Sequence, residues 1–169
     1  FETYFKLAKT IQDDPKYKEA KANRALMGIV NWDPAMVERK AQIIVEHFMN
    51  DVEGVLGGKA KAMVVTSSRP MAYRLYSAMT EYIKKQRYAC QVMVAFSGTL
   101  EVDGKELTEA KINGVSETRT AKVFDSDEKR IIVCANKFQT GFDQPKLCAM
   151  YVDKMLTGVT AVQTLSRLN

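Results

Sequence analysis

The sequence has few of the residues on which several common kinds of active site depend. Its single histidine, His47, falls in a predicted helix, which excludes a serine–histidine site and a histidine–metal site. The three cysteines, Cys90, Cys134 and Cys148, form no Cys-x-x-Cys pair, and two of them fall in predicted strands. We therefore expect buried free thiols in a reducing cytoplasm rather than disulfides or a bound metal.

Long apolar runs and nucleotide-binding loops are also absent. No stretch of ~20 apolar residues is present, so we expect no membrane partner. The triplet Gly57-Gly58-Lys59 lacks both the spacing and the following hydroxyl of a phosphate-binding loop, and no acidic motif for Mg²⁺ occurs. We therefore expect the chain not to hydrolyse ATP by itself.

Size and composition favour one folded core with an appendage. The chain has 169 residues, of which 46% are hydrophobic, and a net charge of +5. That charge is compatible with a phosphate-binding face, although solubility explains it equally well. The first residue is Phe1 and the last residues continue a helical pattern, so we expect a fragment of a longer protein.

The first third of the sequence reads as helices. Asp33 followed by Pro34 is a typical helix start, and apolar residues then recur at helical spacing. These residues are Val37, Ala41, Ile44 and Phe48. We predict a helical support segment over residues 1–58 and a second domain over residues 59–169.

Short apolar runs alternate with helical patterns from residue 62 onward. This alternation predicts an α/β fold with an open, mainly parallel sheet flanked by helices. We expect residues 100–116 to form a polar loop with a helical turn, and a short helix near residues 117–124. The predicted strands are residues 62–65, 91–96, 130–135 and 147–152.

Small polar residues follow the ends of the predicted strands. Thr66-Ser67-Ser68, Ser97-Gly98-Thr99 and Thr140-Gly141 each occupy such a position. The carboxyl ends of parallel strands lie on one edge of a sheet, where ligands commonly bind. The sequence therefore predicts a single polar rim.

The last predicted helix carries polar residues on one side. Gln163, Ser166 and Arg167 are three and four residues apart and share a face. A guanidinium suits a phosphate because it donates two parallel charge-assisted hydrogen bonds. We expect the opposite face to pack on the sheet through Val159, Val162 and Leu165.

Two motifs give a specific resemblance. Thr140-Gly141-Phe142-Asp143-x-Pro145, followed by Gln163-x-x-Ser166-Arg167-x-Asn169, resembles motifs five and six of superfamily-two helicases. The wording is most similar to the motor of the restriction subunit of type I restriction-modification enzymes. The resemblance implies that residues 59–169 are the second RecA-like motor domain of an ATP-dependent DNA translocase, ending within motif six.

The resemblance also assigns roles to residues at the nucleotide. It implies that Arg167 stabilises charge on the γ-phosphate and that Gln163 positions the nucleotide or the attacking water. Gly141 and Asp143 would lie at the ATP site. ATP and Mg²⁺ would be bound mainly by the first motor domain of the same chain.

A second set of residues would contact the DNA backbone. By resemblance these are Ser67, Arg69, Ser97, Gly98 and Thr140. From the residue pattern alone, we expect Ser68 to cap the helix that follows and residues 97–99 to form a turn, whereas Arg69 fits a helix start and a DNA contact equally well. The implied partners are double-stranded DNA and the modification and specificity subunits of the restriction complex, with the nuclease located elsewhere in the protein.

Three other readings remain open from the sequence. Another superfamily-two helicase would usually have Gly before the motif-six arginine, where Ser166 stands here. A nucleotide-cofactor enzyme on a doubly wound sheet needs a glycine-rich turn after its first strand, and residues 66–70 contain no glycine. A catalytically silent interaction module is compatible with the same fold.

Overall fold

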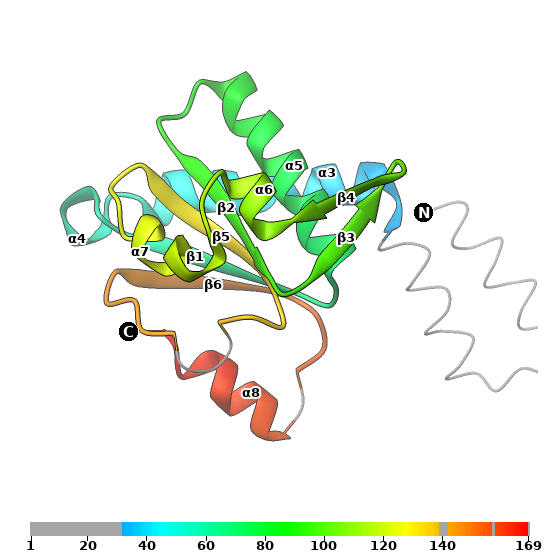
Figure 1. The fold of residues 1–169 in the computed structure, drawn as a ribbon. Helices are drawn as coiled ribbons and strands as arrows, with labels where there is room; N and C mark the ends of the chain where they lie inside the picture. Colours follow the sequence, from blue (N-terminus) through cyan, green and yellow to red (C-terminus); the bar gives the residue numbers. More distant parts are fainter. Residues whose placement is uncertain (1–31, 139–141, 157, 169) are drawn as a thin grey trace, which may run out of the picture. The chain divides into compact units, whose positions relative to one another are not determined.

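The computed structural model describes residues 32–138, 142–156 and 158–168, except the side chain of Thr160 (Figure 1). The chain forms two compact units, Phe1–Arg39 and Lys40–Asn169. The second unit contains the sheet and all the elements described below, apart from the first turns of α3. The predicted boundary between residues 58 and 59 stays a prediction.

Four parallel strands form the central sheet. In chain order they are β1 (Lys61–Thr66), β2 (Gln91–Phe96), β5 (Lys129–Ala135) and β6 (Leu147–Asp153). Their order across the sheet is β2-β5-β1-β6, so β1 and β5 are central. The carboxyl ends are aligned, because Thr66 is paired with Ala135 and with Asp153. The predicted fold class, an α/β domain with a mainly parallel sheet, is confirmed.

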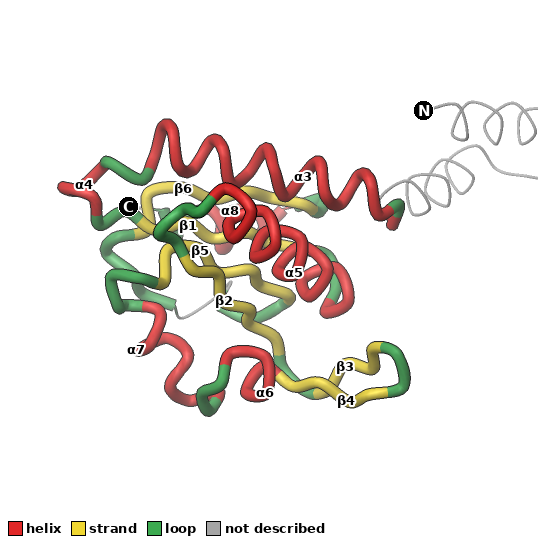
Figure 2. Tube along the Cα trace, turned by 90° about the horizontal axis from the view of Figure 1, so that it is seen from above, coloured by secondary structure: helices red, strands yellow, loops and turns green. Residues whose placement is uncertain are grey.

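Helices cover both faces of the sheet (Figure 2). Residues 40–47 of α3 (Pro34–His47) and α5 (Arg69–Gln86) share one face, where the Glu46 carboxylate accepts hydrogen bonds from Tyr82 and Tyr88 at 2.7 and 3.0 Å. The opposite face carries α6 and α7. The remaining elements are η1 (Phe48–Val52), α4 (Val55–Gly58), α6 (Glu109–Asn113), η2 (Glu117–Arg119), α7 (Thr120–Phe124) and α8 (Gly158–Leu165).

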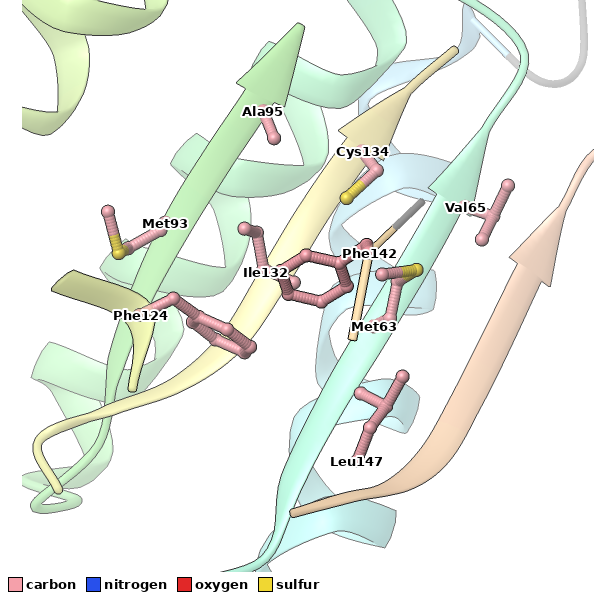
Figure 3. Packing of buried hydrophobic residues seen from close by; sticks show 9 residues of the cluster. All are labelled: Met63, Val65, Met93, Ala95, Phe124, Ile132, Cys134, Phe142 and Leu147. Atoms are coloured by element: carbon pink, nitrogen blue, oxygen red, sulfur yellow. The ribbon is translucent and has the colours of Figure 1, made fainter. Parts of the chain in front are cut away.

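The core on the α6–α7 face is built from residues of all four strands (Figure 3). Strands present side chains to opposite faces in turn, so β1, β2 and β5 each contribute two alternate residues, while β6 contributes Leu147. Phe124 of α7 and Phe142, which precedes β6, close this layer from outside the sheet. The nine residues are Met63, Val65, Met93, Ala95, Phe124, Ile132, Cys134, Phe142 and Leu147.

Helix α5 begins at the end of β1 for a local reason. The Ser68 hydroxyl accepts a hydrogen bond from the amide of Met71 at 3.3 Å, and Pro70 occupies the first turn. This is the N-cap arrangement expected for serine before proline. The cap that the sequence predicts at Ser68 is confirmed.

The helical turn predicted within residues 100–116 is confirmed by α6, but the loop predicted for the rest of this segment was wrong. An antiparallel hairpin, β3 (Thr99–Val102) and β4 (Lys105–Thr108), is followed there by α6. Asp103 and Gly104 make the turn with φ angles of +50° and +72°, which is the geometry favoured by two-residue hairpins. An Asp-Gly pair between alternating apolar residues carries this signal, and the polarity of the segment concealed it.

A buried lysine lies at the amino end of the sheet. Lys61 is fully buried, and its ammonium donates to the carbonyls of Ser126 and Lys129 at 2.7 and 2.6 Å. It also lies 5.0 Å from the centre of the Phe124 ring. Burial, together with nearby positive charges, lowers the pKa of Lys61 from 10.5 to about 8.

The lowered pKa predicts a pH-dependent contribution to stability. Between about pH 8 and 10.5 the unfolded chain binds the Lys61 proton while the folded chain releases it, so this contribution rises with pH. The free energy of unfolding of wild type minus that of Lys61→Met should increase by about 1–2 kcal/mol from pH ~7.5 to pH ~9.5. Urea denaturation measures this, and a constant difference would contradict the assignment.

Candidate functional site

The ends of β1 and β2 bring three of the predicted DNA-facing residues together. Arg69 is the first residue of α5, and its guanidinium donates to the carbonyl of Ser97 at 3.3 Å. Gly98 follows with φ of +80°, and a Cβ there would lie 2.9 Å from Arg69 Nη1. Glycine therefore leaves room for the guanidinium and adopts a left-handed turn without strain. Ser97, Gly98 and Arg69 are all exposed.

The end of β1 is tied to the end of β5. The Thr66 hydroxyl is buried and donates to the carbonyl of Cys134 at 3.0 Å, while the next residue, Ser67, is exposed. Burial raises the pKa of the Cys134 thiol, which therefore stays protonated at neutral pH. The exposed polar residues at the strand ends therefore lie directly after buried residues, among which the Cys134 thiol is unreactive.

The segment between β5 and β6 contains part of the predicted nucleotide site. Thr140 and Gly141 lie outside the described residues. Phe142 is buried and stacks on Phe138 with 4.4 Å between ring centres, as expected for a residue packed beneath the loop. Asp143, which follows it, is exposed.

Gln144 fixes this segment to the preceding helix. Its side chain is buried, the side-chain amide donates to the Asp125 carboxylate at 3.4 Å, and the side-chain oxygen Oε1 accepts from the backbone amide of Lys146 at 3.2 Å. The Lys146 ammonium also contacts Asp125 at 3.0 Å. These contacts set the path of the chain into β6.

Arg167 lies two residues after the end of α8, in a turn, and its side chain reaches back to this segment. Its guanidinium donates to the Phe142 carbonyl at 3.5 Å, to the Gln163 carbonyl at 3.4 Å and to the Ser166 hydroxyl at 3.4 Å. All three bonds are long, and long hydrogen bonds are weak. The guanidinium is half-buried, whereas the side chain of Gln163 is exposed.

The predicted orientation of the last helix was wrong. Val159, Val162 and Leu165 are 71%, 70% and 48% exposed. Among the described side chains of α8, the buried one is Thr164, whose hydroxyl has no hydrogen-bond partner within the part of the chain that the structure describes. Helical spacing identifies an apolar stripe but does not determine which side of a short helix meets the sheet. The helix also ends at Leu165, so Arg167 is placed by a turn and not by the helix.

A buried acidic residue was missed by sequence reasoning. Glu109, in the segment expected to be a loop, is fully buried and forms an ion pair with Lys137 at 2.8 Å. Nothing in the sequence distinguishes it from Glu101 or Glu106, which are exposed. Its burial follows from the hairpin, which places α6 against the edge of β2.

The described part of the chain has neither a metal-binding cluster nor a helix suited to a membrane. Among residues 32–138, 142–156 and 158–168, no group of three or more His, Cys, Asp or Glu residues could hold a metal ion. None of the helices described is both long and apolar enough to cross a membrane.

A family described as "Type I restriction enzyme subunit R domain 3" matches residues 110–169. This match includes β5, β6, α8 and Arg167. Residues 110–169 belong to this family. The resemblance to the restriction subunits of type I enzymes is therefore confirmed, and the chain contains a domain of a type I R subunit.

Curated relatives carry the same description over more of the chain. The endonuclease subunit named for the type I restriction enzyme MjaVIIP of Methanocaldococcus jannaschii is 27% identical over 169 residues, covering 92% of this chain. The corresponding MjaIXP subunit of the same organism is 30% identical over 167 residues, covering 96%. The aligned region is 15% of the length of each relative.

The close approach of the Arg69 guanidinium to Gly98 can be tested by substitution of the glycine. Gly98→Ala should cost about 1 kcal/mol of stability because alanine is strained at this φ, and its methyl group should displace the Arg69 guanidinium. Gly114→Ala is the matched control, with φ of +69° and open space at its Cβ. The NMR signal of the Arg69 Nε–H group should shift only in Gly98→Ala. An equal or absent shift in both variants would contradict the contact.

Proposed function

We propose that this R-subunit domain is the second motor domain of a cytoplasmic, ATP-dependent DNA translocase. The observation that carries the proposal is the position of Arg167, whose guanidinium reaches the carbonyl of Phe142. That carbonyl directly follows Thr140 and Gly141 of the motif-five resemblance. Residues 25 positions apart in sequence therefore meet in the way that a shared nucleotide site requires.

The residues around Arg167 fit a phosphate. The guanidinium is held by three long hydrogen bonds to neutral oxygens, and charge-assisted bonds to a phosphate are roughly twice as strong. It can therefore turn from these acceptors to an anion at little cost. Gln163 is exposed next to it and offers an amide to the nucleotide or to water.

ATP supplies the free energy for movement along DNA when it is bound with Mg²⁺. In this proposal the first motor domain of the same subunit holds most of the nucleotide, and this domain contributes Arg167, Gln163, Gly141 and Asp143. Arg167 would bind and orient the negative charge that develops during phosphoryl transfer. The exposed Asp143 directly follows the buried Phe142, whose packing fixes the backbone from which the Asp143 side chain extends.

The DNA side of the proposal rests on the group at the ends of β1 and β2. Two hydroxyls, from Ser67 and Ser97, are exposed there beside the guanidinium of Arg69. Gly98 adds a turn in which no side chain covers the backbone. Such groups contact phosphates without reading base sequence, as a translocase requires. Thr140 would extend this track. The recognition of a DNA sequence is then left to the specificity subunit, and methylation to the modification subunit.

The relatives support a parent protein that is a restriction endonuclease subunit. Their names describe endonuclease subunits of type I restriction enzymes, and the aligned region is a small part of each. We infer the same parent activity here, with the nuclease site in another domain. The alternative, a motor domain of another superfamily-two helicase, is disfavoured by the family match over residues 110–169.

Removal of the Arg167 side chain tests the nucleotide role. In the full-length subunit, Arg167→Ala should reduce DNA-stimulated ATP hydrolysis at least a hundredfold, because arginines that stabilise phosphoryl transfer contribute factors of this order or more. Arg87→Ala is the control, since it removes an exposed arginine after the C-terminal end of α5. Equal turnover in the two variants would remove the proposed role.

The 169-residue chain alone should bind ATP weakly. It would contribute only one side of the nucleotide site, and half a site lacks most of the phosphate contacts. Isothermal titration calorimetry with Mg²⁺–ATP should give a dissociation constant in the millimolar range, on the order of −4 kcal/mol. Tight one-to-one binding would show that this domain holds the nucleotide itself.

A further inference from the structure

A buried carboxylate joins the end of β2 to the segment that follows β5. One Glu109 oxygen accepts the amide of Phe96, the last residue of β2, at 2.8 Å, and the ammonium of Lys137 at 2.8 Å. The other accepts the hydroxyl of Thr120 at the start of α7. Glu109 is fully buried, so its charge depends on these partners. A single side chain thereby fixes three separate segments.

The partner lysine lies within a strained stretch of backbone. Asn136 and Phe138, on either side of Lys137, have φ angles of +54° and +63°. Asparagine tolerates this region, but a phenylalanine there costs about 1–2 kcal/mol. Such conformations persist only where the surroundings enforce them, and they are concentrated at functional sites.

The contacts that enforce this conformation are the ion pair and a ring stack. Lys137 also contacts Glu117 at 3.3 Å, and its ammonium lies 5.6 Å from the centre of the Phe138 ring. Burial lowers the pKa of Lys137, but the hydrogen bonds and charges of the two glutamates outweigh it and raise the pKa overall. The lysine therefore stays charged. Phe138 in turn stacks on Phe142.

The same route ends at Arg167, because the carbonyl of Phe142 accepts its guanidinium. An uninterrupted series of contacts thus runs from the end of β2, next to Ser97 and Gly98, to the proposed nucleotide-facing arginine. Within the proposed function, the two ends are the DNA contact and the ATP contact. Phe96, Glu109 and Phe142 in this series are buried, and closely packed contacts transmit displacement because they have little freedom to relax.

We infer that the Glu109–Lys137 ion pair is a positioning element for Arg167, which links the DNA-facing end of β2 to the nucleotide-facing side of the domain. The ion pair acts by holding Phe138 and Phe142 in place and does not touch nucleotide or DNA. The inference about position stands on contacts in this chain, whereas its effect on ATP hydrolysis rests on the proposed function.

The position is tested in the 169-residue chain by NMR. Glu109→Gln and Lys137→Met should each shift the backbone amide signals of Phe138 and Phe142 and the Nε–H signal of Arg167. Asn113→Ala is the control, because Asn113 also ties α6 to β2, through both backbone groups of Val94 at 3.0 and 2.7 Å, but does not contact Lys137. Unchanged Arg167 signals in the two pair variants would overturn the inference.

The double variant Glu109→Gln/Lys137→Met separates positioning from stability. Each single change leaves one buried partner without its counter-charge and can prevent folding, whereas removal of both charges is often neutral for stability. The free energy of unfolding should therefore recover in the double variant. The shift of the Arg167 signal should persist, since the ion pair is still missing. A wild-type Arg167 signal in a stable double variant would overturn the inference.

The effect on coupling is measured in the full-length subunit. The kcat of DNA-stimulated ATP hydrolysis should fall about tenfold in the double variant, with little change in the KM for ATP, since misplacement of one catalytic group lowers turnover more than ground-state binding. Recovery of the stimulated kcat together with stability would assign the ion pair a purely structural role. A silent Arg167→Ala would instead contradict the proposed function, while the NMR result still decides the inference about position.

Discussion

Strands β1 and β5 are hydrogen-bonded to neighbours on both edges and buried on both faces, and this constraint organises the rest of the domain. Five consecutive residue pairs join β1 to β5 along Ala62–Thr66 and Ile131–Ala135. A strand in that position has no surface for polar side chains, so polar groups accumulate where each strand ends. The rim that carries Ser67, Arg69 and the segment after β5 follows directly from this burial.

The outer edge of β2 is covered by α6. On β2, the side-chain amide of Asn113 pairs with both backbone groups of Val94, and Glu109 accepts the amide of Phe96, so α6 replaces a neighbouring strand. Covering an edge in this way limits unwanted strand pairing. Glu109 therefore serves two purposes, since the carboxylate that satisfies the edge of β2 also holds Lys137 beside the strained backbone.

The candidate site has two parts, of which one lies within the family match and the other precedes it in the chain. Residues 110–169 contain the part proposed to face the nucleotide, with Phe142, Gln163 and Arg167, and belong to the R-subunit family. The group proposed to face DNA, Arg69, Ser97 and Gly98, precedes that region. It lies within the alignments with the two relatives, which cover 92% and 96% of this chain. Its role therefore rests on exposure and on the guanidinium contact, which make it suitable for a phosphate backbone.

The sequence by itself determined the four strands and the cap at Ser68, because buried strands and capping are local patterns of apolar and hydroxyl residues. It also carried the motif by which the family is identified. Only the tertiary structure decided the burial of Glu109, the exposure of Val159 and Val162, and the contact of Arg167 with Phe142. These features depend on which surfaces meet across long sequence separations, and residue spacing along one element contains no information about its distant partner.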